Sequence, residues 1–191
     1  MPAKDLNELI AWLKANPNKA SAGISTSYQR LTTAFFQKET ATQSTFVPYR
    51  GGAPAMQDLV AGQIDLLFYG PDPLPLVRAG SIRAYAVASD TRLALAPDIP
   101  TFGEMGLPLS FSGAGWQGLF APKGTPKEII DRLNAATVQA LADPLVRSRL
   151  ADLGFEIFPR EQQTPAALGA FQKAQIEKWW PLIKEFGIKV E

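Results

Sequence analysis

Apolar residues recur at helical spacing at the start of the chain and through its last third. Leu6, Leu9 and Leu13 predict a helix over residues 4–15, which Pro17 ends because proline cannot continue a helix. The same periodicity predicts an amphipathic helix over 129–141, a helix from Pro144 to Gly154, and a last helix from 165 to about 186.

Between these regions, short apolar runs alternate with helical patterns. Strands are predicted over 20–24, 45–49, 64–69 and 82–88, with further strand-like stretches at 116–120 and 155–158. Helices are predicted after Ser27, from Pro54 to Ala61 and over 74–79. Strands that alternate with helices indicate an α/β fold with a mainly parallel sheet and crossover helices.

Composition excludes several classes of function. The chain of 191 residues contains no Cys and no His, which excludes thiolate catalysis, Ser-His-Asp chemistry and ordinary zinc or haem sites. Nineteen basic against eighteen acidic side chains give a net charge of +1, so no nucleic-acid partner is expected. We expect no cofactor and no metal, although carboxylate and carbonyl sites for hard cations stay possible.

Neither a membrane span nor a secretory signal is visible in the sequence. No segment approaches the roughly 18 consecutive apolar residues of a transmembrane helix. The first residues lack the basic start and apolar run of a signal peptide. On the residues alone, the protein is cytoplasmic or the chain is a mature or shortened form.

Two strand–turn–helix junctions carry the candidate site. Ser25, Thr26 and Ser27 precede a helix, where free backbone amides and three hydroxyls suit an anion such as a carboxylate; a plain helix cap is the alternative. At the second junction, Arg50 precedes the Gly51-Gly52-Ala53 turn, which allows close backbone approach. Because ligands of parallel α/β sheets sit at the carboxyl ends of strands, the two junctions predict one site.

Other candidate motifs are weaker. Asp65, Asp72 and Glu104 do not share the spacing of a catalytic carboxylate pair, and Asp72, between two prolines, is the better candidate for the site. The run 113–118 matches the dinucleotide fingerprint G-x-G-x-x-G, but a strand and turn are predicted after it in place of the required helix. Trp116, which lies within this run next to Gly115, is a candidate to face a cleft.

Several runs strongly resemble the Bug-type solute-binding receptors of tripartite tricarboxylate transporters. The resemblance extends in order over essentially the whole chain, and its clearest runs are 47–55, 58–66, 78–87, 98–102 and 118–126. It implies a periplasmic-binding-protein type II-like fold, with one parallel-rich α/β lobe plus the C-terminal helical return of the other lobe.

The resemblance also implies a function and a division into lobes. Residues 20–90 would form the second ligand-binding lobe, whereas 1–19 and 91–191 would supply hinge segments and the C-terminal part of the first lobe. The N-terminal part of that lobe is expected to be missing. The implied function is extracytoplasmic, periplasmic capture of a small organic carboxylate without chemistry, with delivery to the membrane components of the transporter.

The family's ligand-contacting loops can be placed on this sequence residue by residue. The polar loop after the first strand of that lobe and the Tyr-basic-Gly turn fall on the two junctions, and Tyr69 stands where many members have Asp. Aromatic groups at Tyr28 and Tyr69 favour a larger or aromatic carboxylate over citrate. The expected ligand-binding residues are Ser25, Thr26, Ser27, Tyr28, Arg50, Gly51, Gly52, Ala53, Tyr69 and Asp72.

Two alternatives stay open from the sequence. One is an enzyme of the same fold that uses Asp72, Asp65 or Tyr69 as acid or base. The other is a ligand-free fragment that forms a homodimer through surfaces left bare by a missing lobe, since exposed strand edges and apolar patches invite pairing.

Overall fold

The structure is a computed structural model of the whole chain and describes residues 3–108 and 116–188. Its contacts divide the chain into two compact units. The first contains Met1–Ser112 together with Leu182–Glu191, and the second contains Gly113–Pro181. The predicted ligand-binding lobe, 20–90, lies inside the first unit.

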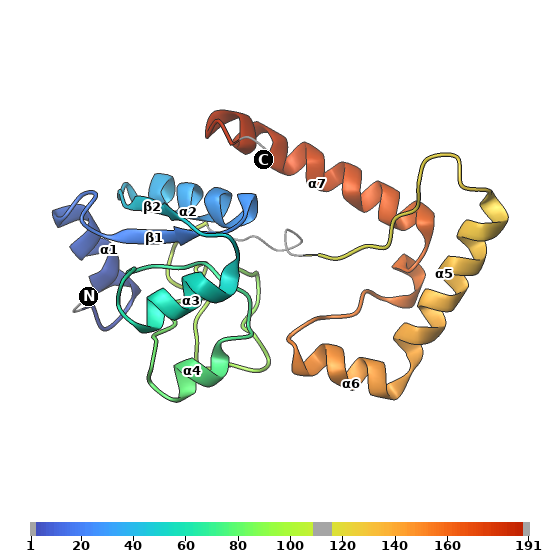
Figure 1. Cartoon of the computed structure of the whole chain (residues 1–191), viewed down its shortest axis with the longest axis horizontal. Coiled ribbons are helices and arrows are strands. Elements are labelled where there is room, and N and C mark those ends of the chain that lie inside the picture. Colours follow the sequence, from blue (N-terminus) through green and yellow to red (C-terminus); the bar gives the residue numbers. More distant parts are fainter. Residues whose placement is uncertain (1–2, 109–115, 189–191) are drawn as a thin grey trace. The chain divides into compact units, whose positions relative to one another are not determined.

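The first unit is built on a pair of parallel strands (Figure 1). β1 and β2 pair in parallel, with Ser21 opposite Thr45 and Ile24 opposite Pro48. Helices α2 and α3 both pack against β1 and lie on either side of it in Figure 1. The elements of this unit, in order, are α1 (Leu6–Ala15), β1 (Ser21–Ile24), α2 (Ser27–Thr40), β2 (Thr45–Pro48), α3 (Gly52–Val60) and α4 (Leu74–Arg78). The α/β prediction is confirmed.

The third and fourth predicted strands are not regular strands. The run 64–69 contacts the sheet through one parallel bridge, between Leu66 and Ala22, and the run 82–88 makes one bridge, between Val87 and Thr101. The amides of Asp65 and Leu66 both donate to the carbonyl of Ser21, at 3.0 Å each. Two successive donors on one acceptor break the alternation that a ladder needs.

The core of the first unit confirms the predicted helical spacing of α1. Leu6, Leu9 and Leu13 are all buried on one side of that helix. Helix α3 begins at Gly52, two residues before Pro54, where the sequence predicted its start. Deeper in the unit, three aromatic rings pack together: the rings of Phe68 and Phe102 stack with centroids 6.2 Å apart, and Phe36 lies 5.9 Å from Phe68.

The second unit is helical in its described residues. Phe155–Phe158 and Trp116–Phe120, both predicted as strands, form none. A strand needs a neighbour for its backbone groups, and no described strand lies in this unit. Its elements are α5 (Lys127–Ala142), α6 (Pro144–Asp152), η1 (Arg160–Gln162) and α7 (Pro165–Glu185), the last of which crosses the unit boundary after Pro181.

Aromatic contacts hold the irregular segments of the second unit. The ring of Phe171 lies edge-on to Trp116 at 5.4 Å and to Phe158 at 5.3 Å between centroids. Trp116, predicted as a candidate cleft residue, therefore packs against α7. The dinucleotide-like run begins at 113–115, outside the described residues, and Trp116–Pro122 forms no helix.

Two searches of the described residues bear on function. No helix there is long and apolar enough to cross a membrane. The same ranges, 3–108 and 116–188, hold no group of three or more acidic side chains arranged to bind a metal ion.

Candidate ligand site

Three parallel segments of the first unit end at the same edge. The amide of Tyr49, just after β2, donates to the carbonyl of Ile24 at the end of β1, at 2.8 Å. On the other side of β1, Gly23 donates its amide to Leu66, at 2.9 Å. The segments that follow these pairings begin at Ser25, Arg50 and Phe68, so the structure brings the predicted loops to one carboxyl edge.

A buried glutamine organises the first loop. Gln29 is 6% exposed, and its side-chain oxygen accepts hydrogen bonds from both the amide and the hydroxyl of Ser25, each at 2.7 Å. Its side-chain nitrogen donates to the carbonyl of Phe68 at 2.9 Å. Gln29 thus ties the start of α2 to the segment that leads into Tyr69.

The hydroxyls at the start of α2 have separate roles. Thr26 is the N-cap, and its Oγ1 accepts from the amide of Gln29 at 3.1 Å, so the capping interpretation is confirmed for this residue. Ser27 and Tyr28 follow in the first turn, with exposed side chains. Partial burial raises the pKa of the Tyr28 hydroxyl above its usual 10.0, so it stays protonated and able to donate at neutral pH.

The second loop leaves the start of α3 without a side-chain cap. Gly51 is the N-cap and has a φ of +149°, a conformation that residues with a β-carbon rarely adopt. No side chain caps this helix, and Pro54 has no amide hydrogen. The first-turn amides of Gly52 and Ala53 therefore lack an intrahelical acceptor and favour an anion. Arg50 is exposed beside them and, within the described chain, forms no ion pair.

Tyr69 lies against the start of α3. A β-carbon on Gly52 would lie 2.8 Å from Cε2 and 2.9 Å from Cζ of Tyr69, closer than any real contact. A β-carbon at position 52 would therefore displace this ring, which is 41% exposed. The structure therefore brings together Gly52 and Tyr69, two predicted site residues 17 positions apart in the sequence.

The three acidic candidates, Asp65, Asp72 and Glu104, lie in different places in the first unit. Asp65 lies at the opposite end of β1, where its carboxylate accepts from the amide of Ser21 at 2.9 Å and from the Ser21 hydroxyl at 3.0 Å. Asp72 is exposed in the turn before α4. Glu104 accepts from Arg92, whose hydrogen bond, together with that from the Thr101 amide, lowers the Glu104 pKa to about 2. Asp65 and Glu104 are therefore structural anchors.

Two side-chain roles that support the site were not predicted from the sequence, although Tyr49 belongs to the predicted Tyr-basic-Gly turn. Gln29 stands three residues after the N-cap Thr26, and T-x-x-Q is a capping-box pattern that could have identified it. The second is the hydroxyl of Tyr49, which donates to Asp58 of α3 at 2.7 Å and so holds the turn between β2 and α3. This bond raises the Tyr49 pKa, and no local pattern signals it.

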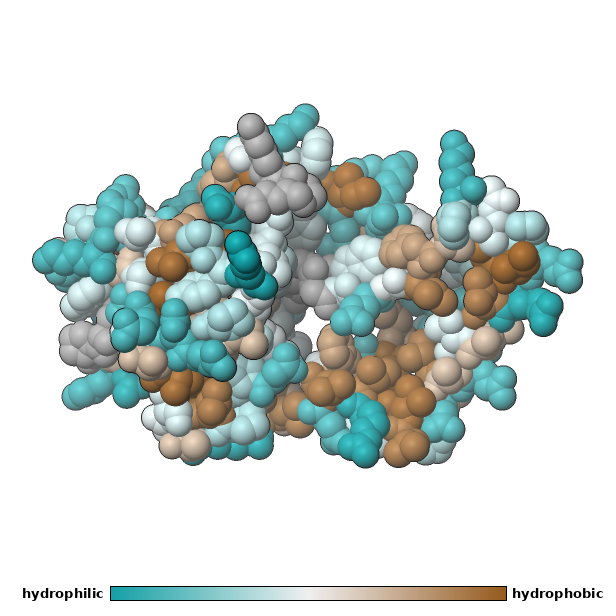
Figure 2. Space-filling model, viewed as in Figure 1, coloured by the Kyte–Doolittle hydropathy of each residue, from teal (hydrophilic) through white to brown (hydrophobic). Residues whose placement is uncertain are grey.

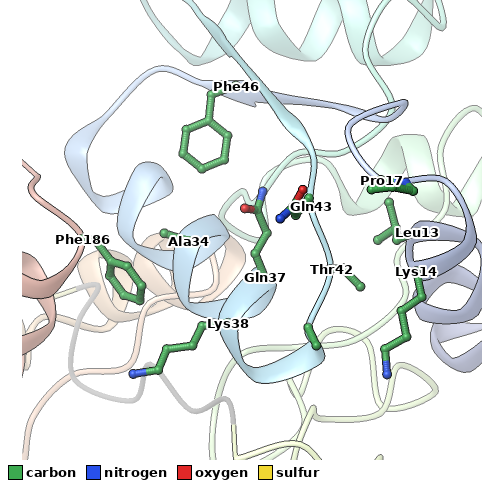
Figure 3. A pocket seen from close by; sticks show the side chains of 11 residues that line it. Leu13, Lys14, Pro17, Ala34, Gln37, Lys38, Thr42, Gln43, Phe46 and Phe186 are labelled. Carbon is green, nitrogen blue, oxygen red and sulfur yellow. The ribbon is translucent and has the colours of Figure 1, made fainter.

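A separate open cavity of about 680 Å³ lies at the other end of α2 (Figure 3). Lys38, Gln37, Phe46 and Phe186 line it, together with the end of α1. Lys38 is paired with Glu185 at 2.7 Å. The carboxyl end of a helix carries a partial negative charge, so this cavity is a poorer carboxylate site than the carboxyl edge of the strands.

Comparison with known proteins identifies a family over nearly the whole chain. The family model described as "Tripartite tricarboxylate transporter family receptor" matches residues 1–188. The chain is 32% identical to the protein BugT of Bordetella pertussis over 189 residues, which cover 97% of this chain and 57% of BugT.

Two solved structures of Rhodopseudomonas palustris proteins are similar in sequence and fold. MatC with bound malate is 32% identical, with a TM-score of 0.80 over 95% of this chain and 63% of MatC. A second protein, solved with adipate, is 29% identical, with a TM-score of 0.79 over 98% of this chain and 62% of its own. The chain spans a little over half the length of the first curated relatives that it matches.

Proposed function

Because the chain belongs to the tripartite tricarboxylate transporter receptor family, we propose that it binds a small organic carboxylate at the carboxyl edge of β1 and β2. The family is one of receptors, and the function is binding without chemistry. The observation that carries the proposal is the uncapped start of α3, which faces the same edge as the hydroxyl-rich start of α2.

The chemistry of this edge suits an anion. The Gly52 and Ala53 amides and the exposed Arg50 supply donors and a positive charge from one side. Thr26, Ser27 and Tyr28 supply hydroxyls from the other. The malate and adipate bound by the two solved relatives are both small carboxylates, which supports this class of ligand.

The wider role follows from the family. The ligand would be captured in the periplasm and delivered to the membrane components of a tripartite tricarboxylate transporter. In that role residues 20–90 act as the second ligand-binding lobe, and the helices of the second unit as the returning part of the first. We propose that Asp72, exposed in the turn before α4, also contributes to the site.

Two tyrosines set the size of the ligand. Tyr69 closes over Gly52, and Tyr28 stands at the start of α2; both rings are 41% exposed. Flat apolar rings at both loops favour a ligand with an apolar body between or beside its carboxylates. A larger or aromatic carboxylate is therefore proposed over citrate.

Calorimetric titration of the full chain with malate, adipate, citrate, benzoate and phenylacetate tests the proposal. We expect at least one carboxylate to bind, and Gly52→Ala to weaken it at least tenfold because the added methyl displaces Tyr69 from the α3 amides. Gly169→Ala, in the open helix position of α7, is the matched control and should bind normally. No binding by any member of the panel would refute the proposal.

Self-association is a second candidate role, favoured by the apolar surface of the second unit. Figure 2 shows a hydrophobic area on this unit. Several large apolar side chains of the unit are exposed, among them Leu145 at 68% and Leu119 at 64%. Burial of such a surface by another copy would be favourable. Sedimentation velocity should then show a dimer; a monomer at high concentration would exclude this role.

A further inference from the structure

We propose that Gln29 is a positioning residue that makes the Ser25 hydroxyl a hydrogen-bond acceptor, so that the site prefers a hydroxycarboxylate over the same carboxylate without its hydroxyl. The ligand hydroxyl would donate to Ser25 Oγ. This inference rests on the proposed carboxylate-binding function and concerns the same site.

The orientation of the Gln29 amide is fixed by its partners. The Ser25 amide can only donate, so it requires the oxygen of Gln29, which lies 2.7 Å away. The Phe68 carbonyl can only accept, so it requires the nitrogen, at 2.9 Å. A reversed amide would set donor against donor and acceptor against acceptor, and Gln29 is too buried for water to relieve that conflict.

Fixing Gln29 also fixes the direction of the Ser25 hydroxyl. A serine hydroxyl has one hydrogen, and here it points at Gln29 Oε1, 2.7 Å from Oγ. Two lone pairs of Oγ remain for other partners. Both donors of Ser25, amide and hydroxyl, are thus committed to Gln29, and Ser25 offers a ligand acceptors only.

This assignment separates two kinds of ligand. A carboxylate oxygen accepts but cannot donate, so it must take its donors from the rest of the site. A ligand hydroxyl can donate to Ser25 Oγ while the bonds to Gln29 stay intact. If the Ser25 hydroxyl instead turned toward a carboxylate, its bond to Gln29 would be lost. One neutral hydrogen bond corresponds to a preference of about fivefold.

The test uses ligand pairs that differ by one hydroxyl beside a carboxylate. Calorimetric titration of the full chain compares malate with succinate and mandelate with phenylacetate. We expect the hydroxy member of the pair that binds to be about fivefold tighter. Ser25→Ala should reduce this ratio to about one.

A matched control lies at the other end of α2. Ser44 Oγ accepts from the side-chain nitrogen of Gln37 at 2.6 Å, so Ser44→Ala also removes a serine–glutamine bond, away from the carboxyl edge. It should leave the ratio unchanged. Gln29→Met frees the Ser25 hydroxyl to donate to a carboxylate, which should bring the ratio toward one, whereas a merely structural role would weaken both ligands equally.

The outcomes separate this inference from the function on which it rests. Equal affinity within each pair, or a preference that survives Ser25→Ala, overturns the inference while carboxylate binding stands. Failure of all four ligands to bind overturns the inference, and the proposed function falls with it only if adipate, citrate and benzoate also fail to bind.

Discussion

The two units of this chain differ in how they bury their apolar residues. Among the described residues, thirteen of the fifteen buried apolar side chains lie in the first unit, whereas ten of the fourteen large exposed ones lie in the second. The first unit contains the strand pair and the stacked rings of Phe68 and Phe102. The second unit consists of helices and irregular segments that contact one another through half-exposed aromatic side chains such as Phe158.

This difference explains why the first unit is the better place for a ligand site. A binding loop keeps its geometry only where the elements beneath it are rigid. The proposed site stands entirely on the first unit, where Gln29 and the Phe68 backbone join its loops. The second unit exposes apolar side chains on its helices, among them Leu133 and Leu145.

The largest expected contrast is between the aromatic clusters of the two units. Phe102 is 5% exposed and Phe158 is 41% exposed. Phe102→Ala should lower the free energy of unfolding of the first unit by about 3–5 kcal/mol. Phe158→Ala should lower that of the second by about 1–2 kcal/mol. Hydrogen exchange, which reports on each unit separately, measures both. Equal losses would show that the second unit has a core as tight as the first.

Helix caps should not show this contrast, because a cap is a local interaction. Asp5 caps α1 by accepting from the amide of Glu8 at 2.9 Å, and Asp143 caps α6 by accepting from the amide of Leu145 at 2.8 Å. Asp5→Ala and Asp143→Ala should each cost their own unit about 1 kcal/mol. The same exchange measurement applies. A loss several times larger in one unit would mean that its cap also carries tertiary packing.

The smallest effect concerns pH and the first unit alone. Arg92 and the Thr101 amide lower the Glu104 pKa from 4.5 to about 2. Stability from this carboxylate is therefore complete above about pH 4.5 and is lost as the pH falls toward 2. Urea titrations should show a shallower fall over that range for Glu104→Gln than for the unchanged protein. Identical slopes would contradict the role given to this pair.

The sequence predicted the elements better than their pairing. The spacing of Leu6, Leu9 and Leu13 predicted α1, and the two loops of the site were predicted at the ends of the first two strands. The run 64–69 reads as a strand because it is apolar, yet its pairing stops at Leu66. Where a strand stops depends on distant backbone partners, which local periodicity does not encode.

The site shows the same limit. Hydroxyl and glycine residues at strand–helix junctions could be predicted from their types. The contact of Tyr69 with Gly52 could not, because it depends on how the third segment packs beside β1. The capping-box spacing of Thr26 and Gln29 could have identified Gln29 from the sequence. Its hydrogen bond to Phe68 joins residues 39 positions apart and could be found only in the structure.

The most direct test of the account is an amide NMR titration of the full chain with malate, repeated with phenylacetate. The account predicts that the largest shifts fall on the amides of 26–28, 52–53 and 69–70, at the carboxyl edge of the first unit. Shifts that gather instead around Lys38 and Phe186, at the other end of α2, would contradict it, as would the absence of shifts with these two ligands and with adipate, citrate and benzoate.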